Sequence, residues 1–332
     1  MATPYKIYGA IASPYSVKIR ALMRYRRLPH IWIDGNAARA AALADVKVPV
    51  IPVVEFPDGS RHNDSTPLIR KLEERHASRS VVPIHDGNAF LAALIEDFAD
   101  EWLTKAMFLY RWRAEVDQEV VSRWLVFDGL KRAGPDLGAK AAAFKARQTG
   151  RLEMVSGTGS GSAALVKAST HAVLSALEAH LTDGFFLFGS RPSAAEFAVF
   201  GQLAQLASDP TPMAMMRERY PHTNRWLDHV SDLSGVEGEW SDGITKGTRA
   251  LLSVIGKVYL PFLAANAAAV EAGGEEVAFS AMGHDYRQAP FGYQTKCLAS
   301  LRSQYHALDE QAARDIRDIL SDTDCLTYFE GK

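Results

Sequence analysis

One stretch near the N-terminus decides the fold: YKIYGAIASPYS, residues 5–16. It begins with a short run that favours a β-strand, Tyr5 to Tyr8, and continues into Ser13-Pro14, a pair that commonly opens a helix. The helix that follows carries apolar residues on one side, and Pro29 ends it. A strand that leads into an amphipathic helix predicts the first half of an α/β unit.

The same alternation of strand and helix signals continues to about residue 75. Turn-forming residues, Asp34-Gly35 and Pro57-Asp58-Gly59-Ser60, separate the segments. The expected strands and helices cover residues 30–33, 37–44, 52–56, 61–63 and 64–74. The predicted order is βαβαββα, a small α/β domain over residues 1–82.

From Asn88 onward nearly the whole chain has helical periodicity. Helices are expected over residues 90–107, 137–155, 163–181, 194–206, 213–233, 245–270 and 293–320. Residues 273–290 are rich in glycine and aromatic residues, which indicates a loop or a short hairpin. We therefore predict an all-α domain over residues 87–332, without a sheet of more than two strands within residues 90–235.

The composition is that of an ordinary globular protein. The 332 residues are 47% hydrophobic and 23% charged, with a formal net charge of −2, which excludes wholesale disorder and gives no general attraction to nucleic acid or membranes. The five basic residues from Lys18 to Arg27 indicate a solvated helix face. The most apolar window, 251–270, is interrupted by a lysine and a proline and predicts a buried helix. Two cysteines, Cys297 and Cys325, suit a reducing cytoplasm.

Three segments could bind a ligand, and each has a plainer structural explanation. Ser13 lies where the N–H groups and dipole of a helix favour a thiolate, carboxylate or phosphate, but an ordinary N-cap explains it too. Asp64 and Ser65 begin another helix. Asp64 could bind an ammonium and Ser65 a carboxylate, or both could only cap that helix. A cis Ile51–Pro52 bond would expose the Ile51 backbone to a peptide-like ligand, although bond frequencies alone favour trans.

The remaining polar clusters favour structural roles. Asp97, Asp100 and Glu101 could form a carboxylate site, but a solvated helix face or pairing with Arg111 or Arg113 is the simpler interpretation. The ten histidines show no metal-ligand spacing with cysteine, and the usual nucleophile and phosphate-binding motifs are not found in a usable context. We therefore expect no metal.

Four segments, in this order and spacing, resemble the glutathione transferase superfamily. Tyr5–Arg20 is similar to its first strand, active-site turn and first helix, and Val50–Val54 to its cis-proline strand. Asp64–Glu73 resembles the segment that holds the γ-glutamyl end of glutathione, and Phe188–Phe197 the family's capping motif. The resemblance covers residues 3–235. It implies an α/β thioredoxin-like N-terminal domain followed by a larger all-α helical domain.

The resemblance also implies a site and partners. Glutathione would be the co-substrate, with Ser13 stabilising its thiolate and the Ile51–Pro52 bond cis; Tyr8 and Tyr15 are alternative partners of the sulfur. The implied glutathione-binding residues are Tyr15, Ile51, Pro52, Asp64 and Ser65. The implied walls of the second-substrate pocket are Trp102, Met107, Tyr110, Arg111 and Trp112. Related proteins also imply a homodimer.

Departures from the family leave two functions open. Redox members carry cysteines at the positions of Ser13 and Ser16, and the chain continues beyond a usual member's end as an extension over residues 238–332. The first hypothesis is a glutathione transferase that acts on an apolar or aromatic electrophile, with glutathione-dependent β-ether cleavage as a narrower form. The alternative is a non-catalytic binding or scaffolding member.

Overall fold

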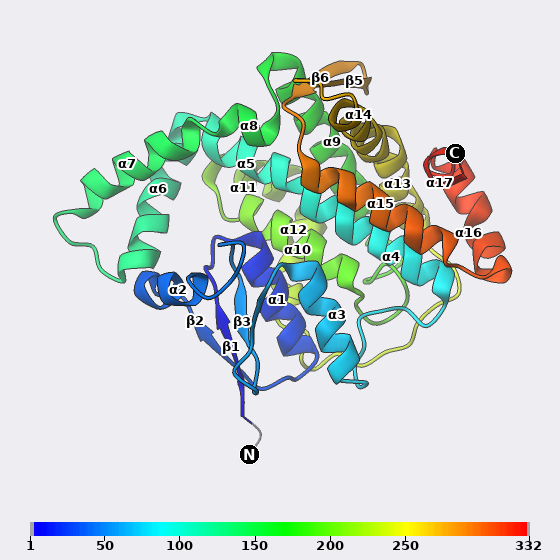
Figure 1. Cartoon of the computed structure of the whole chain (residues 1–332), viewed down its shortest axis with the longest axis horizontal. Helices are drawn as coiled ribbons and strands as arrows, with labels where there is room; N and C mark the ends of the chain where they lie inside the picture. Colours follow the sequence, from blue (N-terminus) through cyan, green and yellow to red (C-terminus); the bar gives the residue numbers. More distant parts are fainter. Residues whose placement is uncertain (1–2, 331–332) are drawn as a thin grey trace.

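Figure 1 shows a computed structural model of the chain, which describes residues 3–330. The N-terminal part is built on a four-stranded sheet of order β2-β1-β3-β4, in which β1 and β2 are parallel and the other pairs antiparallel. Its elements are β1 (Tyr5–Tyr8), α1 (Pro14–Tyr25), β2 (His30–Ile33), α2 (Asn36–Leu43), β3 (Val53–Glu55), β4 (Arg61–Asn63) and α3 (Ser65–Arg75). The predicted βαβαββα order of a thioredoxin-like domain is confirmed.

The rest of the described chain is almost entirely helical, as predicted. Its elements are α4 (Asp86–Phe98), a π-helical turn (Ala99–Leu103), α5 (Thr104–Arg113), α6 (Glu115–Leu130), α7 (Leu137–Thr149), α8 (Leu152–Ser156), α9 (Gly159–His180), α10 (Ala194–Leu206), α11 (Pro210–Arg219), α12 (Pro221–Val230), α13 (Lys246–Val254), a second π-helical turn (Ile255–Tyr259), α14 (Leu260–Glu271), β5 (Val277–Ala281), β6 (His284–Gln288), α15 (Gly292–His306), α16 (Glu310–Asp322) and α17 (Thr327–Glu330). The antiparallel pair β5-β6 is the short hairpin that the glycine-rich segment allowed.

Helix α6 is an element that the periodicity did not predict. Its apolar residues do not form one stripe: Val121 is buried, whereas Trp124 and Phe127 are exposed. With α7 it forms an arm that projects to one side of the molecule and reaches over α2 (Figure 1). An ion pair between Lys131 and Asp34 joins the arm to the N-terminal domain at 2.7 Å. The arm therefore overhangs the end of the sheet at which β1 and β2 end and the chain turns into α1.

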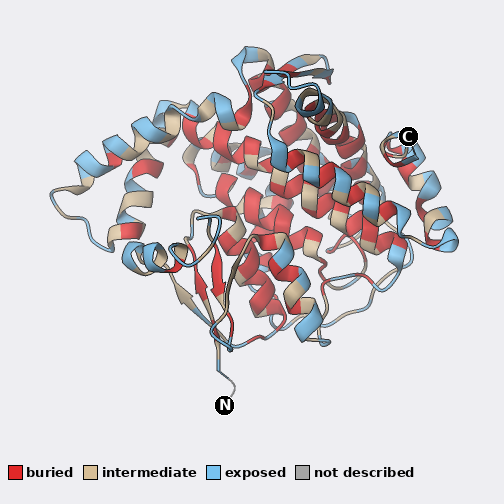
Figure 2. Ribbon diagram, in the orientation of Figure 1, coloured by how far each residue is buried: buried red, intermediate tan, exposed pale blue. Residues whose placement is uncertain are grey.

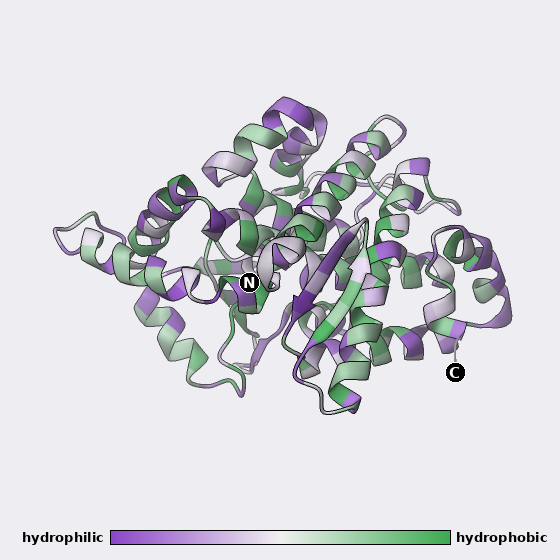
Figure 3. Ribbon diagram, turned by 90° about the horizontal axis from the view of Figure 1, so that it is seen from above, coloured by the Kyte–Doolittle hydropathy of each residue, from purple (hydrophilic) through white to green (hydrophobic). Residues whose placement is uncertain are grey.

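The core lies where the two domains meet. Helix α1 packs against α10, and the buried ribbon in Figure 2 is concentrated around α1, α4 and α10, while the arm of α6 and α7 is largely exposed. Figure 3 shows hydrophobic stretches on helices that cross the middle of the molecule and hydrophilic outer turns. The predicted capping box is confirmed, since the Ser193 N–H donates to a Glu196 carboxylate oxygen at 2.8 Å.

The extension over residues 238–332 packs on the helical domain through its described part. Helix α13 lies against α9, and α15 lies against both α14 and α4. The continuous helical stretch Lys246–Glu271 is long and apolar enough to cross a membrane, but 61% of its most apolar window is buried inside the protein. It is therefore a core helix of the kind expected for this window.

Candidate functional site

The three segments singled out from the sequence meet at one end of the sheet. Strand β3 begins at Val53, which pairs with the last residue of β1 and with the last residue of β4. The residues just beyond these partners therefore lie close together: Gly9–Ser13 after β1, Ile51-Pro52 before β3, and Asp64-Ser65 after β4. The Ile51–Pro52 peptide bond is cis, which confirms what the resemblance implied.

Ser13 is the N-cap of α1 and faces a cavity. Its backbone is extended, and its Oγ accepts a hydrogen bond from the Ser16 N–H at 3.3 Å. The hydroxyl proton remains available for an anion at this helix start, where the helix dipole adds positive potential. Ser16, one turn further along, is buried and does not line the cavity.

Two residues of the helical domain hold the turn that precedes Ser13. Arg111 Nη1 donates to the Ala12 carbonyl at 3.0 Å, and Gln205 Nε2 donates to the Ile11 carbonyl at 3.1 Å. The buried Arg111 guanidinium is balanced by Asp209, with Nε 2.7 Å from Oδ2. Arg111 therefore joins the two domains at the edge of the cavity and holds the backbone of the turn that precedes Ser13.

The cavity between the turn and the helical domain has a volume of about 1090 Å³. Ser13, Tyr15 and Ile51 line one side of it, and Met107 and Trp112 line another. Its further walls are Phe108, Leu125, Val126 and Phe144, with the basic residues Arg39, Lys140, Arg147 and Arg151. The cavity thus combines an apolar, aromatic lining with several positive charges.

Two of the residues expected in the second-substrate pocket lie elsewhere. Trp102 is fully buried, and its Nε1 donates to Ser169 Oγ at 3.0 Å in the helical core. Tyr110 lies close to Tyr220, and burial raises its pKa to about 12. Neither residue lines the cavity. Trp102 lies in the π-helical turn ahead of α5 and faces the helical core, whereas Met107 lies on α5 and faces the cavity.

The aromatic wall of the cavity was only partly anticipated from the sequence. Phe108 follows Met107 on α5 and lies four positions before Trp112, so the i, i+4 spacing of Phe108 and Trp112 could have identified it. Phe144 comes from α7, and its ring centre is 5.9 Å from that of Trp112. Nothing local to Phe144 signals this contact, because it depends on how the arm folds back.

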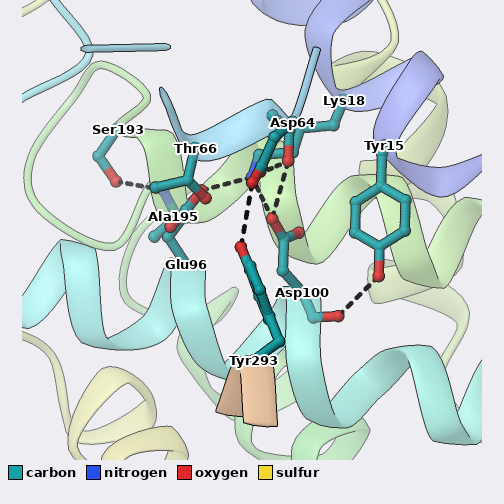
Figure 4. A network of polar contacts seen from close by, with 10 residues as sticks. Tyr15, Lys18, Asp64, Thr66, Glu96, Asp100, Ser193, Ala195 and Tyr293 are labelled. Carbon is teal, nitrogen blue, oxygen red and sulfur yellow. Dashed lines mark hydrogen bonds and ion pairs between the residues drawn. The ribbon is translucent and has the colours of Figure 1, made fainter. Parts of the chain in front are cut away.

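The two tyrosines considered as partners of the sulfur are engaged by other groups. The Tyr15 hydroxyl donates to the Asp100 carbonyl at 2.9 Å (Figure 4), and the Tyr8 hydroxyl donates to Glu55 Oε2 at 3.2 Å. Burial raises the pKa of the Tyr15 phenol, so this group stays protonated. The Tyr15 ring still lines the cavity and can contact a ligand by packing.

A buried ionic network of Lys18, Glu96 and Asp100 lies beside Asp64 (Figure 4). The Lys18 ammonium is 2.6 Å from Asp100 Oδ2 and also contacts Glu96. Burial alone would lower the pKa of Lys18, but the two carboxylates outweigh it and raise that pKa above its ordinary value. The prediction that Lys18 belongs to a solvated face was wrong, because its partners come from a helix that the sequence could not place beside it.

The Ser65 hydroxyl belongs to this network. It accepts a hydrogen bond from Lys18 Nζ at 3.2 Å and donates to Asp100 Oδ2 at 3.0 Å, and the residue is buried. Its side chain is therefore committed within the protein. What remains for a carboxylate ligand is the set of backbone N–H groups at the start of α3.

The acidic residues at the end of α4 are neither on a solvated face nor paired with the arginines of α5, which corrects the sequence interpretation. Asp97 Oδ2 accepts from the Tyr259 hydroxyl at 2.5 Å, and Glu101 Oε2 accepts from Gln294 Nε2 at 3.3 Å. Burial raises the pKa of Asp97 to about 7 and that of Glu101 to about 8. Their partners lie 162 and 193 residues away in the extension, which explains why sequence reasoning missed them.

Two family profiles match the chain. The glutathione S-transferase N-terminal domain matches residues 7–80, and the glutathione S-transferase C-terminal domain matches residues 146–229. The chain belongs to the glutathione S-transferase superfamily. Comparison with curated proteins finds no match. Among residues 3–330, no group of three or more His, Cys, Asp or Glu side chains is arranged to hold a metal ion.

Solved structures that align with most of this chain, glutathione S-transferases among them, do so at low sequence identity. One from Rhodospirillum rubrum F11 is 18% identical, with 75% of this chain and 91% of that chain covered and a TM-score of 0.45. One from Methylobacterium radiotolerans, solved with glutathione sulfonate, is 20% identical, with 74% and 99% covered and a TM-score of 0.41. The β-etherase LigF from Sphingobium sp. strain SYK-6 is 14% identical, with 69% and 95% covered and a TM-score of 0.48.

Proposed function

We propose that the protein is a glutathione transferase that joins glutathione to an apolar or aromatic electrophile. The observation that carries the proposal is the cavity, which has Ser13 and Ile51 on one side and Met107 and Trp112 on another. A helix N-terminus with a serine hydroxyl suits a thiolate. Apolar and aromatic walls suit the second substrate.

The binding roles follow from position. Ser13 donates its hydroxyl to the sulfur, Ile51 and Pro52 offer their backbone to the cysteine, and Tyr15 packs its ring against the peptide. Asp64 takes the ammonium of the γ-glutamyl end, and the N–H groups beginning with Ser65 take its carboxylate. With an electrophile that carries a leaving group, a carbon–sulfur bond forms as the bond to the leaving group breaks. The leaving group keeps that electron pair, and the thiol proton passes to solvent.

The basic residues of the cavity narrow the substrate class. Arg39, Arg147 and Arg151 line the cavity and form no ion pair with other residues of the described range 3–330. Unpaired guanidinium groups beside an apolar wall favour a substrate that carries a carboxylate or another anionic group next to its ring. We therefore propose an aromatic acid in preference to a neutral aromatic compound.

The test is retention on immobilised glutathione, followed by turnover of chromogenic electrophiles in matched pairs, one neutral and one with a carboxylate on the same ring. We expect retention, turnover, and faster reaction of the anionic member. Arg147→Gln with Arg151→Gln should remove that preference and keep turnover of the neutral member. Retention without turnover on a broad panel would instead support a non-catalytic binding protein, and failure of both would refute the proposal.

We further propose that the protein works in the cytoplasm as a homodimer. Both cysteines are free and buried, which suits a reducing compartment. We propose the dimer because related proteins commonly form homodimers. Light scattering at micromolar concentration should give about 73 kDa, twice the chain mass of 36.4 kDa. A mass near that of a single chain would refute it.

A further inference from the structure

The first turn of α15 brings a residue of the extension onto the start of α3. The Tyr293 hydroxyl donates to Asp64 Oδ2 at 3.1 Å, across 229 residues of sequence (Figure 4). Within the described residues, it is the one hydrogen bond that joins the N-terminal segment 3–82 to residues 238–330. The extension thus touches the thioredoxin-like domain at a residue implied in glutathione binding.

Asp64 has an unusual conformation for a residue that begins a helix. It is the N-cap of α3, yet its side chain makes no capping hydrogen bond, and its φ of 69° lies in the left-handed region. Its carboxylate points towards Tyr293 (Figure 4). Asp64 forms no ion pair with any residue between 3 and 330, so its negative charge is available to a cationic ligand.

Tyr293 is suited to hold this carboxylate and remain accessible. Burial and the nearby Asp64 charge raise the pKa of its phenol, so the hydroxyl stays a hydrogen-bond donor. The residue is 41% exposed, and its ring lies beside that of Phe291, with centroids 6.4 Å apart. The phenol occupies one lone pair of Oδ2 and leaves room on the carboxylate for a second donor.

We propose that Tyr293 is a positioning residue of the glutathione site, which orients the Asp64 carboxylate towards the primary ammonium of the γ-glutamyl group. The inference rests on the proposed function. It gives the extension a specific role, because a segment that lies outside both matched family domains supplies a residue to the site. The group that Asp64 recognises is the α-amino group of the ligand. Tyr293 has no role towards the sulfur or the electrophile.

The test compares two ligands by calorimetry: glutathione, and its analogue in which hydrogen replaces the γ-glutamyl amino group. Tyr293→Phe removes one hydroxyl and keeps the ring. We expect it to weaken glutathione binding by about 3- to 10-fold, as for the loss of one hydrogen bond, and to leave binding of the analogue unchanged. Equal weakening of both ligands, or of neither, would overturn the inference.

Two further variants separate a positioning role from a structural one. Tyr305→Phe, on the same helix, removes a hydroxyl that donates to Glu330 at 3.2 Å and should leave both affinities unchanged. Asp64→Asn should weaken glutathione binding, and adding Tyr293→Phe to it should cost nothing more. Additive losses would contradict the coupling. If the wild-type protein binds neither ligand, the proposed function fails and the inference fails with it, whereas wild-type binding unaffected by Tyr293→Phe overturns the inference alone.

Discussion

Ser13 and Ser16 lie one helical turn apart and face different surroundings. We predict that Ser13→Ala raises the pKa of the bound glutathione thiol and lowers kcat/KM at pH 7. The lost charge-assisted hydrogen bond is worth about 1.5–3 kcal/mol, or about one to two pKa units. Because an unassisted thiol has a pKa of about 8.5, the loss should shrink at pH 9. A pH–rate profile measures both effects.

The matched control for this prediction is Ser16→Ala, since Ser16 is buried away from the cavity and its Oγ has no hydrogen-bond partner among the described residues. Its profile should coincide with that of the wild type. If the Ser13→Ala profile does so as well, the start of α1 activates the sulfur without the hydroxyl.

Ser65 is expected to matter more for stability than for binding. Ser65→Ala removes a partner from both Lys18 and Asp100, and the free energy of unfolding should fall by about 1–3 kcal/mol, the range for leaving buried polar groups unsatisfied. Urea unfolding measures it, with the exposed Ser303→Ala as control. An unchanged unfolding free energy together with weaker glutathione binding would show that the Ser65 hydroxyl contacts the ligand and does not stabilise the fold.

Single residues were predicted well where their surroundings are local. The Ser193–Glu196 capping box needs only four consecutive residues, and Ser13 as an N-cap needs only the helix that follows it. Lys18 and Trp102 were misplaced because their surroundings come from distant segments. A lysine in an amphipathic helix normally points to water, and only the tertiary contact with Glu96 and Asp100 reverses this.

At the scale of elements, α5 and α10 together hold the turn that precedes Ser13. Arg111→Met leaves Asp209 buried without its cation and removes the donor to the Ala12 carbonyl. We predict a loss of about 3–5 kcal/mol in unfolding free energy, as for breaking a buried pair, together with lower kcat.

Adding Asp209→Leu to Arg111→Met should separate these two effects. Removal of both charges restores most of the stability, whereas the Ala12 carbonyl still lacks its donor, so kcat should stay low. Recovery of kcat along with stability would show that Arg111 acts only through the ion pair and not through the turn.

The contact between α4, the second π-helical turn and α15 should make stability depend on pH. Asp97 faces Tyr259 and Cys297 on those two elements, and Glu96, Asp100 and Glu101 are the acids near it on its own segment. Its pKa rises from 3.8 to about 7 on folding, so the folded state binds more protons between these values. The contribution of Asp97 to the free energy of unfolding is therefore fully present below about pH 4 and is lost as the pH rises to 7.

Asp97→Asn should therefore flatten the fall in Tm between pH 5 and pH 7.5, because the amide keeps an acceptor for the Tyr259 hydroxyl and does not ionise. The exposed Asp318→Asn on α16 should leave the slope unchanged. Parallel Tm curves for Asp97→Asn and the wild type would contradict the assignment.

Elements with one apolar stripe or clear turn residues were predictable, and these include the whole βαβαββα unit. The failures have identifiable causes. Helix α6 lacks a single apolar face, and the two π-helical turns, which shift the register in α4–α5 and α13–α14, leave no mark on the periodicity. The walls of the cavity were predicted within residues 102–112 alone, although α7 supplies Phe144 and Arg147 to it.

For the whole molecule, the change from mixed to helical periodicity identified the fold class, and the matched family domains confirm it. The described part of the extension, residues 238–330, packs on the helical domain and does not form a separate layer. Its helices cover α9 and α4 and share their core. The apolar faces of these helices are therefore buried only when they pack against the helical domain. Its contribution to the site, through Tyr293, depends on a contact that no local pattern encodes.

The position of Lys18 also constrains how the chain folds while it is being synthesised. The ribosome releases α1 before α4, and until Glu96 and Asp100 emerge the ammonium has no carboxylate beside it. Enclosing an unpaired cation would cost several kcal/mol, so before α4 is present the ammonium should stay in contact with water. We therefore expect the surface of α1 around Lys18 to stay hydrated until α4 has left the exit tunnel and can pack against it.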